Sequence, residues 1–231
     1  MLEVDIRSKS FRTARGAELP ALGEVGFTVA PGEFVCLTGP SGCGKTTTLK
    51  LILGLDTDFE GSIRRPSGRL AAVFQEPRLL PWRSVEQNVR LALPEELASA
   101  DLTPLFELLG IPATERLYPG ELSLGMARRV ALARAFALEP ALLLLDEPFV
   151  SLDDATAERL RTLLMSVWNA RPTAALMVTH NLREAAELAD RIVLLSERPG
   201  HVVKVVSIDT PRGARDAATI DRIVSKLRPR G

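Results

Sequence analysis

The most constraining feature of this sequence is a glycine-rich stretch that follows a short apolar run. It reads Gly39-Pro40-Ser41-Gly42-Cys43-Gly44-Lys45-Thr46 and matches the pattern G-x-x-x-x-G-K-[ST]. Such a loop binds phosphate through backbone N–H groups and a helix N-terminus, so it has to leave a strand and open a helix. The flanking segments 33–38 and 46–53 have strand and helix character, and Gly54 ends the second. An α/β fold with a phosphate site is therefore favoured over an ordinary glycine-rich turn.

The side chains of this loop have distinct expected roles. Lys45 should reach the β- and γ-phosphates of a nucleotide, and the hydroxyl of Thr46 should bind Mg²⁺. We include Thr47 with the loop as a nucleotide-binding residue. The cofactors predicted from the loop are therefore a nucleoside triphosphate and Mg²⁺.

A second motif supplies acidic groups. The apolar run 141–145 reads as a strand buried on both faces, and Asp146 and Glu147 follow it. Ligands of open α/β sheets bind where strands exit, so we expect Asp146 to hold Mg²⁺ and Glu147 to act as general base on water. The alternative is an acidic helix cap after a core strand. The phosphate loop in the same chain favours the catalytic interpretation.

Strand-like and helix-like segments alternate along much of the chain, which predicts a mainly parallel sheet. Expected strands are 2–6, 26–29, 33–38, 70–74, 141–145, 174–178, 191–195 and 201–207. Expected helices are 46–53, a helix capped by Ser84 and Gln87, 103–110, 123–137, 154–169, 182–188 and 218–227. Strand signals are scarce after residue 76. We therefore expect one domain with a core of 1–75 and 138–210, an inserted helical subdomain of 76–137 and a tail of 211–231.

Composition narrows the class of partner and compartment. The 29 Lys and Arg balance 29 Asp and Glu, which gives no overall attraction to nucleic acid. The two cysteines suggest neither a disulfide framework nor a metal site. The first residues lack the apolar core of a signal peptide, and we find no apolar window of transmembrane length. We expect a cytosolic chain that reaches a membrane only through a partner.

The segment between the two motifs resembles a known family. Leu122-Ser123-Leu124-Gly125-Met126, followed by ARRVALARAFALEP, resembles the LSGGQ signature of the ATP-binding cassette (ABC) ATPases. Other positions match the motifs of this family: Gln75 the Q-loop, Asp153 the D-loop, His180 the switch histidine and Phe11 an adenine-stacking aromatic. The resemblance runs from about residue 2 to 210 and covers six motifs in order.

The resemblance implies a P-loop NTPase of the ABC type, with an antiparallel β element and a head-to-tail pair of cassettes, either a homodimer or two paired subunits. Each ATP would lie between one phosphate loop and the opposite signature, so Ser123 and Gly125 would contact the γ-phosphate in trans. Gln75 would contribute to Mg²⁺ binding and catalysis, and His180 would contact the γ-phosphate in cis. His180 as a surface histidine and Phe11 as a core residue are the simpler alternatives.

Two signature positions depart from the family. Leu124 replaces a glycine and Met126 a glutamine, while the contacting positions Ser123 and Gly125 are intact. We interpret this as a tolerated variant. A weakly active assembly subunit is the alternative.

The segment 75–89 looks like the Q-loop region of importers for nitrate, aliphatic sulfonates and taurine. This branch implies an integral membrane permease, a separate substrate-binding protein and a peripheral position at the cytoplasmic face of the membrane. Leu79, Leu80 and Trp82 would help to bind the permease, or else simply pack the subdomain. A cassette ATPase that acts on DNA or ribosomes is the rival, and the absence of a basic stripe or coiled-coil insertion argues against it.

Overall fold

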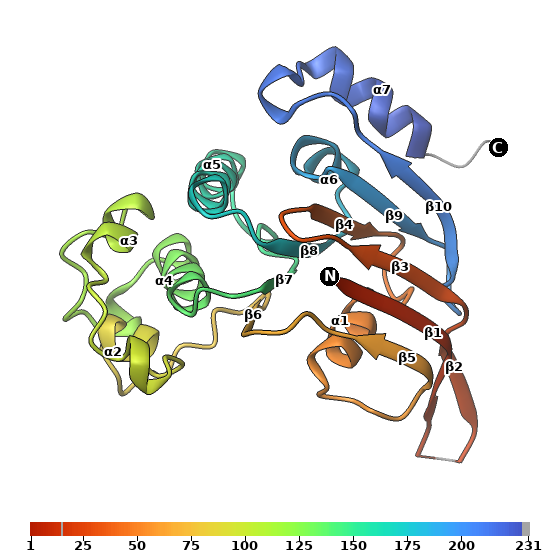
Figure 1. The fold of residues 1–231 in the computed structure, drawn as a ribbon, viewed down its shortest axis with the longest axis horizontal. Helices are drawn as coiled ribbons and strands as arrows, with labels where there is room; N and C mark the ends of the chain where they lie inside the picture. The colour runs from red at the N-terminus through yellow and green to blue at the C-terminus, as the bar shows by residue number, and fades with distance from the viewer. Residues whose placement is uncertain (15, 228–231) are drawn as a thin grey trace. The chain divides into compact units, whose positions relative to one another are not determined.

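The computed structural model describes residues 1–14 and 16–227 (Figure 1). Its contacts divide the chain into two compact units. The first unit combines Met1–Pro66 with Ala174–Gly231, and the second is Ser67–Thr173. Each unit is described by itself.

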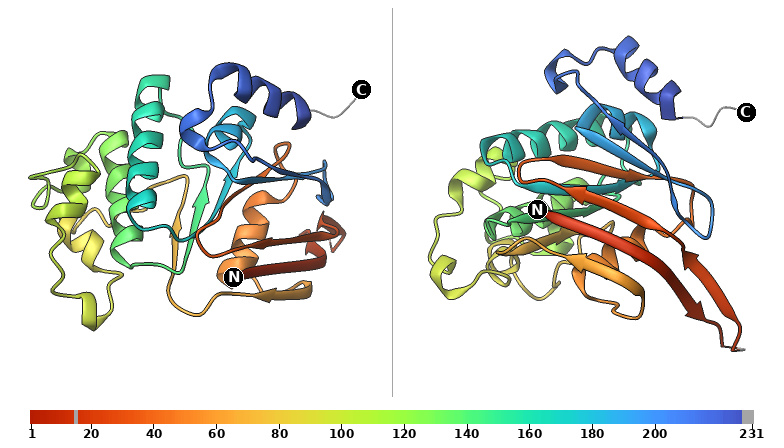
Figure 2. Two further views of the ribbon diagram at one scale, coloured as in Figure 1. Left: turned by 45° about the horizontal axis from the view of Figure 1, so that its top comes forward. Right: turned by 45° about the vertical axis from the view of Figure 1, so that its right-hand side comes forward.

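The first unit contains an antiparallel sheet organised around one long strand, which Figure 2 shows from two directions in the red of the N-terminus. The strands are β1 (Leu2–Arg12), β2 (Glu18–Leu22), β3 (Val25–Val29) and β5 (Glu60–Arg64). Strand β1 pairs antiparallel with all three of the others. Leu2, Val4 and Ile6 are buried while the residues between them are more exposed, as expected for a strand with one face on the core.

A second sheet of this unit is mainly parallel. The strands of this sheet that lie in the first unit are β4 (Phe34–Thr38), β8 (Ala174–Thr179), β9 (Arg191–Leu195) and β10 (Val202–Ser207). Strand β4 lies between β8 and β9, parallel to both, and β10 runs antiparallel to β9. Every residue of β4 and β8 is buried, which explains their continuous apolar sequences. The helical segments are α1 (Lys45–Leu53), α6 (Leu182–Leu188), the 3₁₀ turn Arg212–Ala214 and α7 (Ala217–Leu227).

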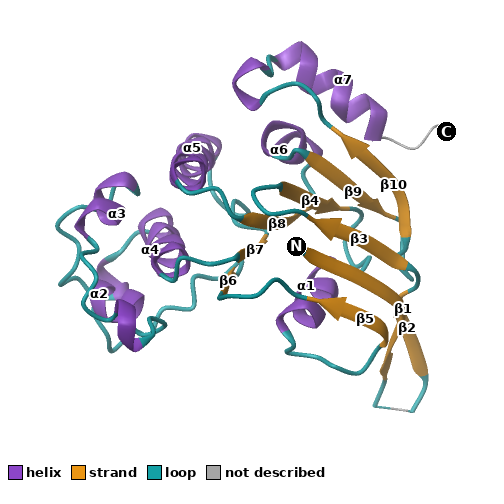
Figure 3. Cartoon of the chain, in the orientation of Figure 1, coloured by secondary structure: helices purple, strands orange, loops and turns teal. Residues whose placement is uncertain are grey.

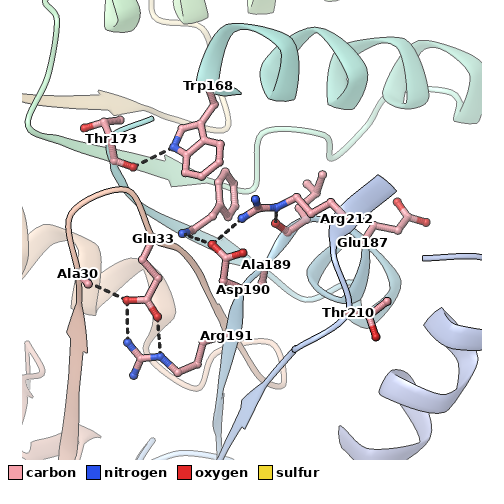
Figure 4. A network of polar contacts seen from close by, with 12 residues as sticks. Ala30, Glu33, Trp168, Thr173, Glu187, Ala189, Asp190, Arg191, Thr210 and Arg212 are labelled. Carbon is pink, nitrogen blue, oxygen red and sulfur yellow. Dashed lines mark hydrogen bonds and ion pairs between the residues drawn. The ribbon is translucent and has the colours of Figure 1, made fainter. Parts of the chain in front are cut away.

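Two ion pairs hold the strand ends of the first unit (Figure 4). Glu33 accepts hydrogen bonds from Nε and Nη2 of Arg191 at 2.8 and 2.9 Å, and Nη2 also donates to the carbonyl oxygen of Thr28 at 2.8 Å. Asp190 accepts the N–H of Phe34 at 2.9 Å and pairs with Arg212 at 2.6 Å. Because Arg191 and Asp190 lie at the start of β9, these contacts fix that strand to the beginning of β4.

The second unit is mostly helical, as the purple segments of Figure 3 show. Its two strands, β6 (Leu70–Val73) and β7 (Leu142–Asp146), are parallel neighbours. The helices are α2 (Val85–Arg90), α3 (Thr103–Leu108), α4 (Leu124–Ala137) and α5 (Asp154–Ala170), with 3₁₀ turns at Glu95–Leu97 and Pro119–Glu121. Helix α4 packs against α2, α3, α5 and β6.

The predicted α/β class, with parallel strands and an antiparallel element, is confirmed. Ser84 and Gln87 form the predicted capping box, and Ser123 caps α4. The strands β2 and β5 are not predicted from the sequence, and β1 continues to Arg12 although a strand of 2–6 is predicted. The second compact unit, Ser67–Thr173, includes β6, α4 and α5, whose residues pack together, while the division into a core and an inserted subdomain of 76–137 stays a prediction.

Candidate functional site

The phosphate loop lies between β4 and α1, the position that its motif requires. Gly39, Gly42 and Gly44 all have positive φ angles, of 157°, 78° and 105°. Gly44 is the N-cap of α1. The side chains of Ser41 and Thr46 are exposed. The loop therefore curls over the N-terminus of α1, with the side chains of Ser41 and Thr46 at its exposed surface.

Lys45 is buried under this loop. Its side chain is 6% exposed, and Nζ donates to the carbonyl oxygens of Gly39 and Pro40, each at 2.8 Å. A cation held at the centre of the loop is well placed to bind an anion, because the carbonyl bonds fix it without neutralising its charge. The geometry fits the predicted role of a phosphate-binding lysine.

Two segments outside the motif, around Leu22 and Gly200, pack closely against the phosphate loop. A Cβ at Gly44 would lie 2.2 Å from Cδ2 of Leu22, and a Cβ at Gly200 would lie 1.9 Å from the carbonyl oxygen of Cys43. Leu22 and Gly200 form an isolated bridge, and the N–H of Gly200 donates to Ala21 at 3.1 Å. Sequence reasoning missed Gly200. Its only signal was a glycine beside a proline, which by itself indicates a turn.

His180 emerges from the same sheet edge as the phosphate loop. In the parallel pair β4 and β8, Thr38 is opposite Thr179, so Gly39 and His180 are the next residues on the two strands. Gly39, Pro40 and His180 line one hollow of about 490 Å³. Hydrogen bonds fix the backbone around the histidine: the N–H of Asn181 donates to the hydroxyl of Thr179 at 3.0 Å.

Phe11 lies near the end of β1 and is 40% exposed. Nζ of Lys9 lies over one face of the ring, 4.9 Å from the ring centroid. Lys9 is itself buried and donates to Asp56 at 2.9 Å and to the carbonyl oxygen of Asp58 at 2.5 Å. Burial opposes the ionisation of Asp56, but the hydrogen bonds from Lys9 and the N–H of Asp58, together with the charges of Lys9 and Lys50, outweigh it, so the pKa of Asp56 is lowered. The exposure of Phe11 contradicts the alternative of a fully buried core residue and leaves part of the ring available for stacking.

The second unit places Gln75, Asp146 and Glu147 at one sheet edge. Strands β6 and β7 are parallel with Val73 opposite Leu145, so both chains exit in the same direction. Asp146 is the last residue of β7 and is 8% exposed. Glu147 has a φ angle of 47°, a left-handed conformation that is rare outside glycine and concentrates at functional sites.

The signature residues lie at the N-terminus of α4. Ser123 is the N-cap, and its Oγ accepts the N–H of Met126 at 3.2 Å. Leu124 is 47% exposed. A Cβ at Gly125 would lie 3.1 Å from Cγ2 of Thr156. The bulk of Leu124 therefore faces outward, while glycine fits the tighter position.

Asp153 caps the next helix of this unit. Its side chain accepts the N–H of Thr156 at 2.9 Å at the start of α5. Hydrogen bonds from the hydroxyl and the N–H of Thr156 lower the pKa of Asp153. The D-loop residue is thus held as a carboxylate next to a helix N-terminus.

The residues predicted to bind Mg²⁺ present oxygen donors only: the Thr46 hydroxyl, the Gln75 amide and the Asp146 carboxylate. Mg²⁺ in nucleotide sites is bound by one or two carboxylates together with phosphate oxygens, so a single aspartate fits this ion. Thr46 belongs to the first unit, and Gln75 and Asp146 belong to the second.

Known proteins share this arrangement. The sequence profile of the family described as ABC transporter matches residues 22–150. An aliphatic sulfonates import ATP-binding protein, SsuB 2 of Burkholderia lata, is 45% identical over 205 residues, which are 84% of this chain and 75% of that protein. SsuB of Bacillus subtilis is 39% identical over 89% of this chain and 84% of its own length.

Solved structures agree with the sequence relatives. The dimeric structure of MJ0796, a bacterial ABC transporter cassette, has a TM-score of 0.76 at 26% identity, covering 91% of this chain and 100% of that one. A structure described as the ATP-binding subunit of an ABC transporter has a TM-score of 0.77 at 30% identity, covering 98% of this chain and 99% of that one. A post-hydrolysis state of the MJ0796 cassette was solved with ADP and Pi and has a TM-score of 0.74 at 25% identity, covering 91% of this chain and 100% of that one.

Proposed function

This chain belongs to the ABC transporter family, and on that premise we propose that it is the subunit that binds and hydrolyses ATP to drive a solute importer. The observation that carries the proposal is the phosphate loop, with Lys45 buried beneath it and His180 leaving the neighbouring parallel strand. The family match confirms the ABC ATPase fold and the ATPase activity predicted from the sequence.

For ATP binding, we assign the phosphate loop and the next residue to the phosphates and Phe11 to the adenine. The exposed part of the Phe11 ring supports stacking, which is worth about 1–3 kcal/mol and discriminates poorly between purines. The backbone N–H groups behind the loop and the charge of Lys45 supply phosphate affinity.

For hydrolysis, we assign Glu147 as the base that takes a proton from water, with Gln75 and His180 orienting the reactants. Thr46, Gln75 and Asp146 would hold Mg²⁺, which neutralises charge that develops on the phosphate oxygens. Ser123 and Gly125 serve the ATP of the opposite cassette, and Asp153 lies in the D-loop of the same interface. These roles support a dimer, because a signature motif that acts in trans has no ligand in a lone subunit.

The partners follow from the importer role. Cassette structures related to this chain form dimers, so the chain pairs with a second cassette, and it works with an integral membrane permease. The finer proposals are a homodimer, a separate substrate-binding protein that delivers the solute, and a small anionic solute of the nitrate, sulfonate or taurine kind. The sulfonate relatives support the last of these.

We also propose a position in the cell, which depends on the permease. No helix in the described residues is long and apolar enough to span a bilayer. We place the chain at the cytoplasmic face of the membrane, held there by its partner. The predicted division into an ATP-binding core and a helical subdomain of 76–137 remains part of the proposal.

The test is steady-state ATP hydrolysis by the purified chain and by its Glu147→Gln variant. The variant should bind ATP as tightly as the wild type, lose hydrolysis and accumulate as an ATP-bound dimer in size-exclusion chromatography. The reason is that the amide keeps the shape of Glu147 and removes the base. Near-normal turnover by the variant would refute the assignment of Glu147, and a wild type without turnover would favour the weakly active assembly subunit.

A further inference from the structure

Helix α4 carries arginines, of which Arg128 is buried, whose partners are backbone carbonyls rather than carboxylates. Arg128 is 5% exposed, and its Nη1 donates to the carbonyl oxygen of Pro148 at 2.9 Å. Among the described residues its Nε has no partner and no carboxylate lies within ion-pair distance of it. Burial lowers the pKa of Arg128. A buried cation of this kind costs stability, so packing alone gives no reason for an arginine at this position.

The carbonyl that Arg128 holds belongs to the loop of the proposed base. Pro148 follows Glu147 directly, and both Glu147 and Ser151 have positive φ angles, of 47° and 61°. Such backbone conformations are strained and persist only where the surroundings enforce them. Phe149 is held from a second side by Arg161 of α5, whose guanidinium lies 5.9 Å from the ring centroid.

A second arginine of α4 holds the loop that follows Gln75. Arg134 donates from Nη1 to the carbonyl oxygen of Arg78 at 2.9 Å and from Nη2 to that of Pro77 at 2.8 Å. Arg78 also has a positive φ angle, of 49°. In the described part of the chain, five non-glycine residues have positive φ, and three of them, Arg78, Glu147 and Ser151, lie in these two loops.

We propose that Arg128 and Arg134 are positioning residues that attach the loops of Glu147 and Gln75 to the signature helix of the same subunit. Arg128 is five positions after Ser123, roughly 7.5 Å along the helix, so the N-terminus of α4 and the held loops form one rigid piece. A contact at Ser123 then bears on the geometry of the base in its own subunit. This inference rests on the proposed roles of Glu147 and Ser123.

The chain supplies a matched control on the same helix. Arg129 also donates a single hydrogen bond to a backbone carbonyl, from Nη1 to Gly110 at 3.1 Å, and its Nε also lacks a partner among the described residues. Gly110 follows α3, away from both Glu147 and Gln75 in the sequence. Arg128→Met and Arg129→Met therefore remove the same chemistry from one helix, and only the first releases the Glu147 loop.

The experiment measures kcat, KM for ATP, nucleotide affinity and melting temperature for the three variants Arg128→Met, Arg128→Lys and Arg129→Met. We expect Arg128→Met to lower kcat at least tenfold, with nucleotide affinity within twofold of the wild type and a melting temperature that does not fall. Arg128→Lys should restore part of kcat, because an ammonium can still donate to Pro148. Arg129→Met should keep the wild-type kcat.

Several outcomes would overturn the inference. An Arg128→Met variant with normal kcat would show that the Pro148 contact does not position the base. Equal losses for Arg128→Met and Arg129→Met, or a parallel fall in affinity and melting temperature, would reduce Arg128 to a packing residue. If Arg128→Met does not fold, Arg128→Lys is compared with the shorter Arg128→Gln. Equal kcat values for these two variants would likewise show that Arg128 does not position the base. Loss of hydrolysis in Glu147→Gln together with normal kcat in Arg128→Met would refute this inference alone.

Discussion

Gly200 lies so close to the carbonyl oxygen of Cys43 that a Cβ added to it would be 1.9 Å from that oxygen. The two nearest atoms, the carbonyl oxygen and carbon of Cys43, are backbone, which cannot move aside as a flexible side chain can. The loop around residue 200 therefore packs directly against the backbone of the phosphate loop at Cys43. This support depends on the absence of a single methyl group.

Gly200→Ala should weaken ATP binding. Relief of the overlap has to displace Cys43, and overpacking of this kind typically costs about 1–3 kcal/mol. We expect the dissociation constant for ATP, measured by fluorescence titration, to rise about tenfold. Gly213→Ala is the control, because a Cβ there meets nothing within 4 Å and its φ is not positive. Unchanged ATP affinity in Gly200→Ala would show that the phosphate loop tolerates the shift.

Ser123→Ala should reduce turnover more than Leu124→Gly changes it in either direction. Ser123 caps α4 and stands at a contacting position of the signature, whereas the Leu124 side chain is 47% exposed. Loss of a serine cap costs about 1 kcal/mol of stability, so the control is Ser84→Ala, which removes the cap of α2. Steady-state ATPase assays should show a loss for Ser123→Ala alone. A large gain of activity in Leu124→Gly would favour the weakly active alternative.

Glu33→Gln should lower stability in a pH-dependent way. Burial opposes ionisation of Glu33, but hydrogen bonds from Arg191 and Ala30 outweigh it, so the pKa of this carboxyl is lowered in the folded state. A lowered carboxyl pKa stabilises the fold above the unfolded value of about 4.3, and that contribution is lost as pH falls through the lower folded value. Urea unfolding should show a loss of about 1–2 kcal/mol in the variant near neutral pH.

The difference between wild type and Glu33→Gln should shrink as the pH approaches about 4 and below. Glu3→Gln is the comparison, because Glu3 pairs with an Arg64 side chain that is 78% exposed and such pairs contribute little. A pH-independent effect in Glu33→Gln would mean that the charge of Glu33 is not the cause.

The catalytic motifs could be predicted because each encodes its own local structure. The glycines of residues 39–44 supply positive φ angles, and the apolar runs of β4 and β7 indicate strands buried on both faces. The strands β2 and β5 were missed because nearly all of β5 and most of β2 is exposed, so neither carries a strong apolar pattern. Their existence depends on pairing with β1.

The supporting residues could not be predicted for a related reason. The carbonyl oxygens that contact Gly200, Arg128 and Arg134 lie between 20 and 157 residues away from them in the sequence. At Gly200 the contact is possible only because glycine has no Cβ. A surface arginine and a turn glycine would have the same local sequence. Such roles become apparent only when the tertiary contacts are known.

Trp82→Ala should weaken assembly with the permease and leave the isolated subunit largely unaffected. The Trp82 side chain is 70% exposed, and the loop that presents it is held by Asn88, which is fully buried and bonds to the backbone at Leu80 and Arg83. A large aromatic on a fixed loop is typical of an interface anchor, whose truncation can cost about 2 kcal/mol or more. Co-purification of the tagged permease with the variant should fall about tenfold or more, while ATPase activity and melting temperature of the subunit stay near wild type. Leu55→Ala is the control, because Leu55 is 66% exposed and lies outside the proposed docking segment. Normal assembly of the Trp82 variant, or a lowered melting temperature, would instead assign the segment to packing of its own unit.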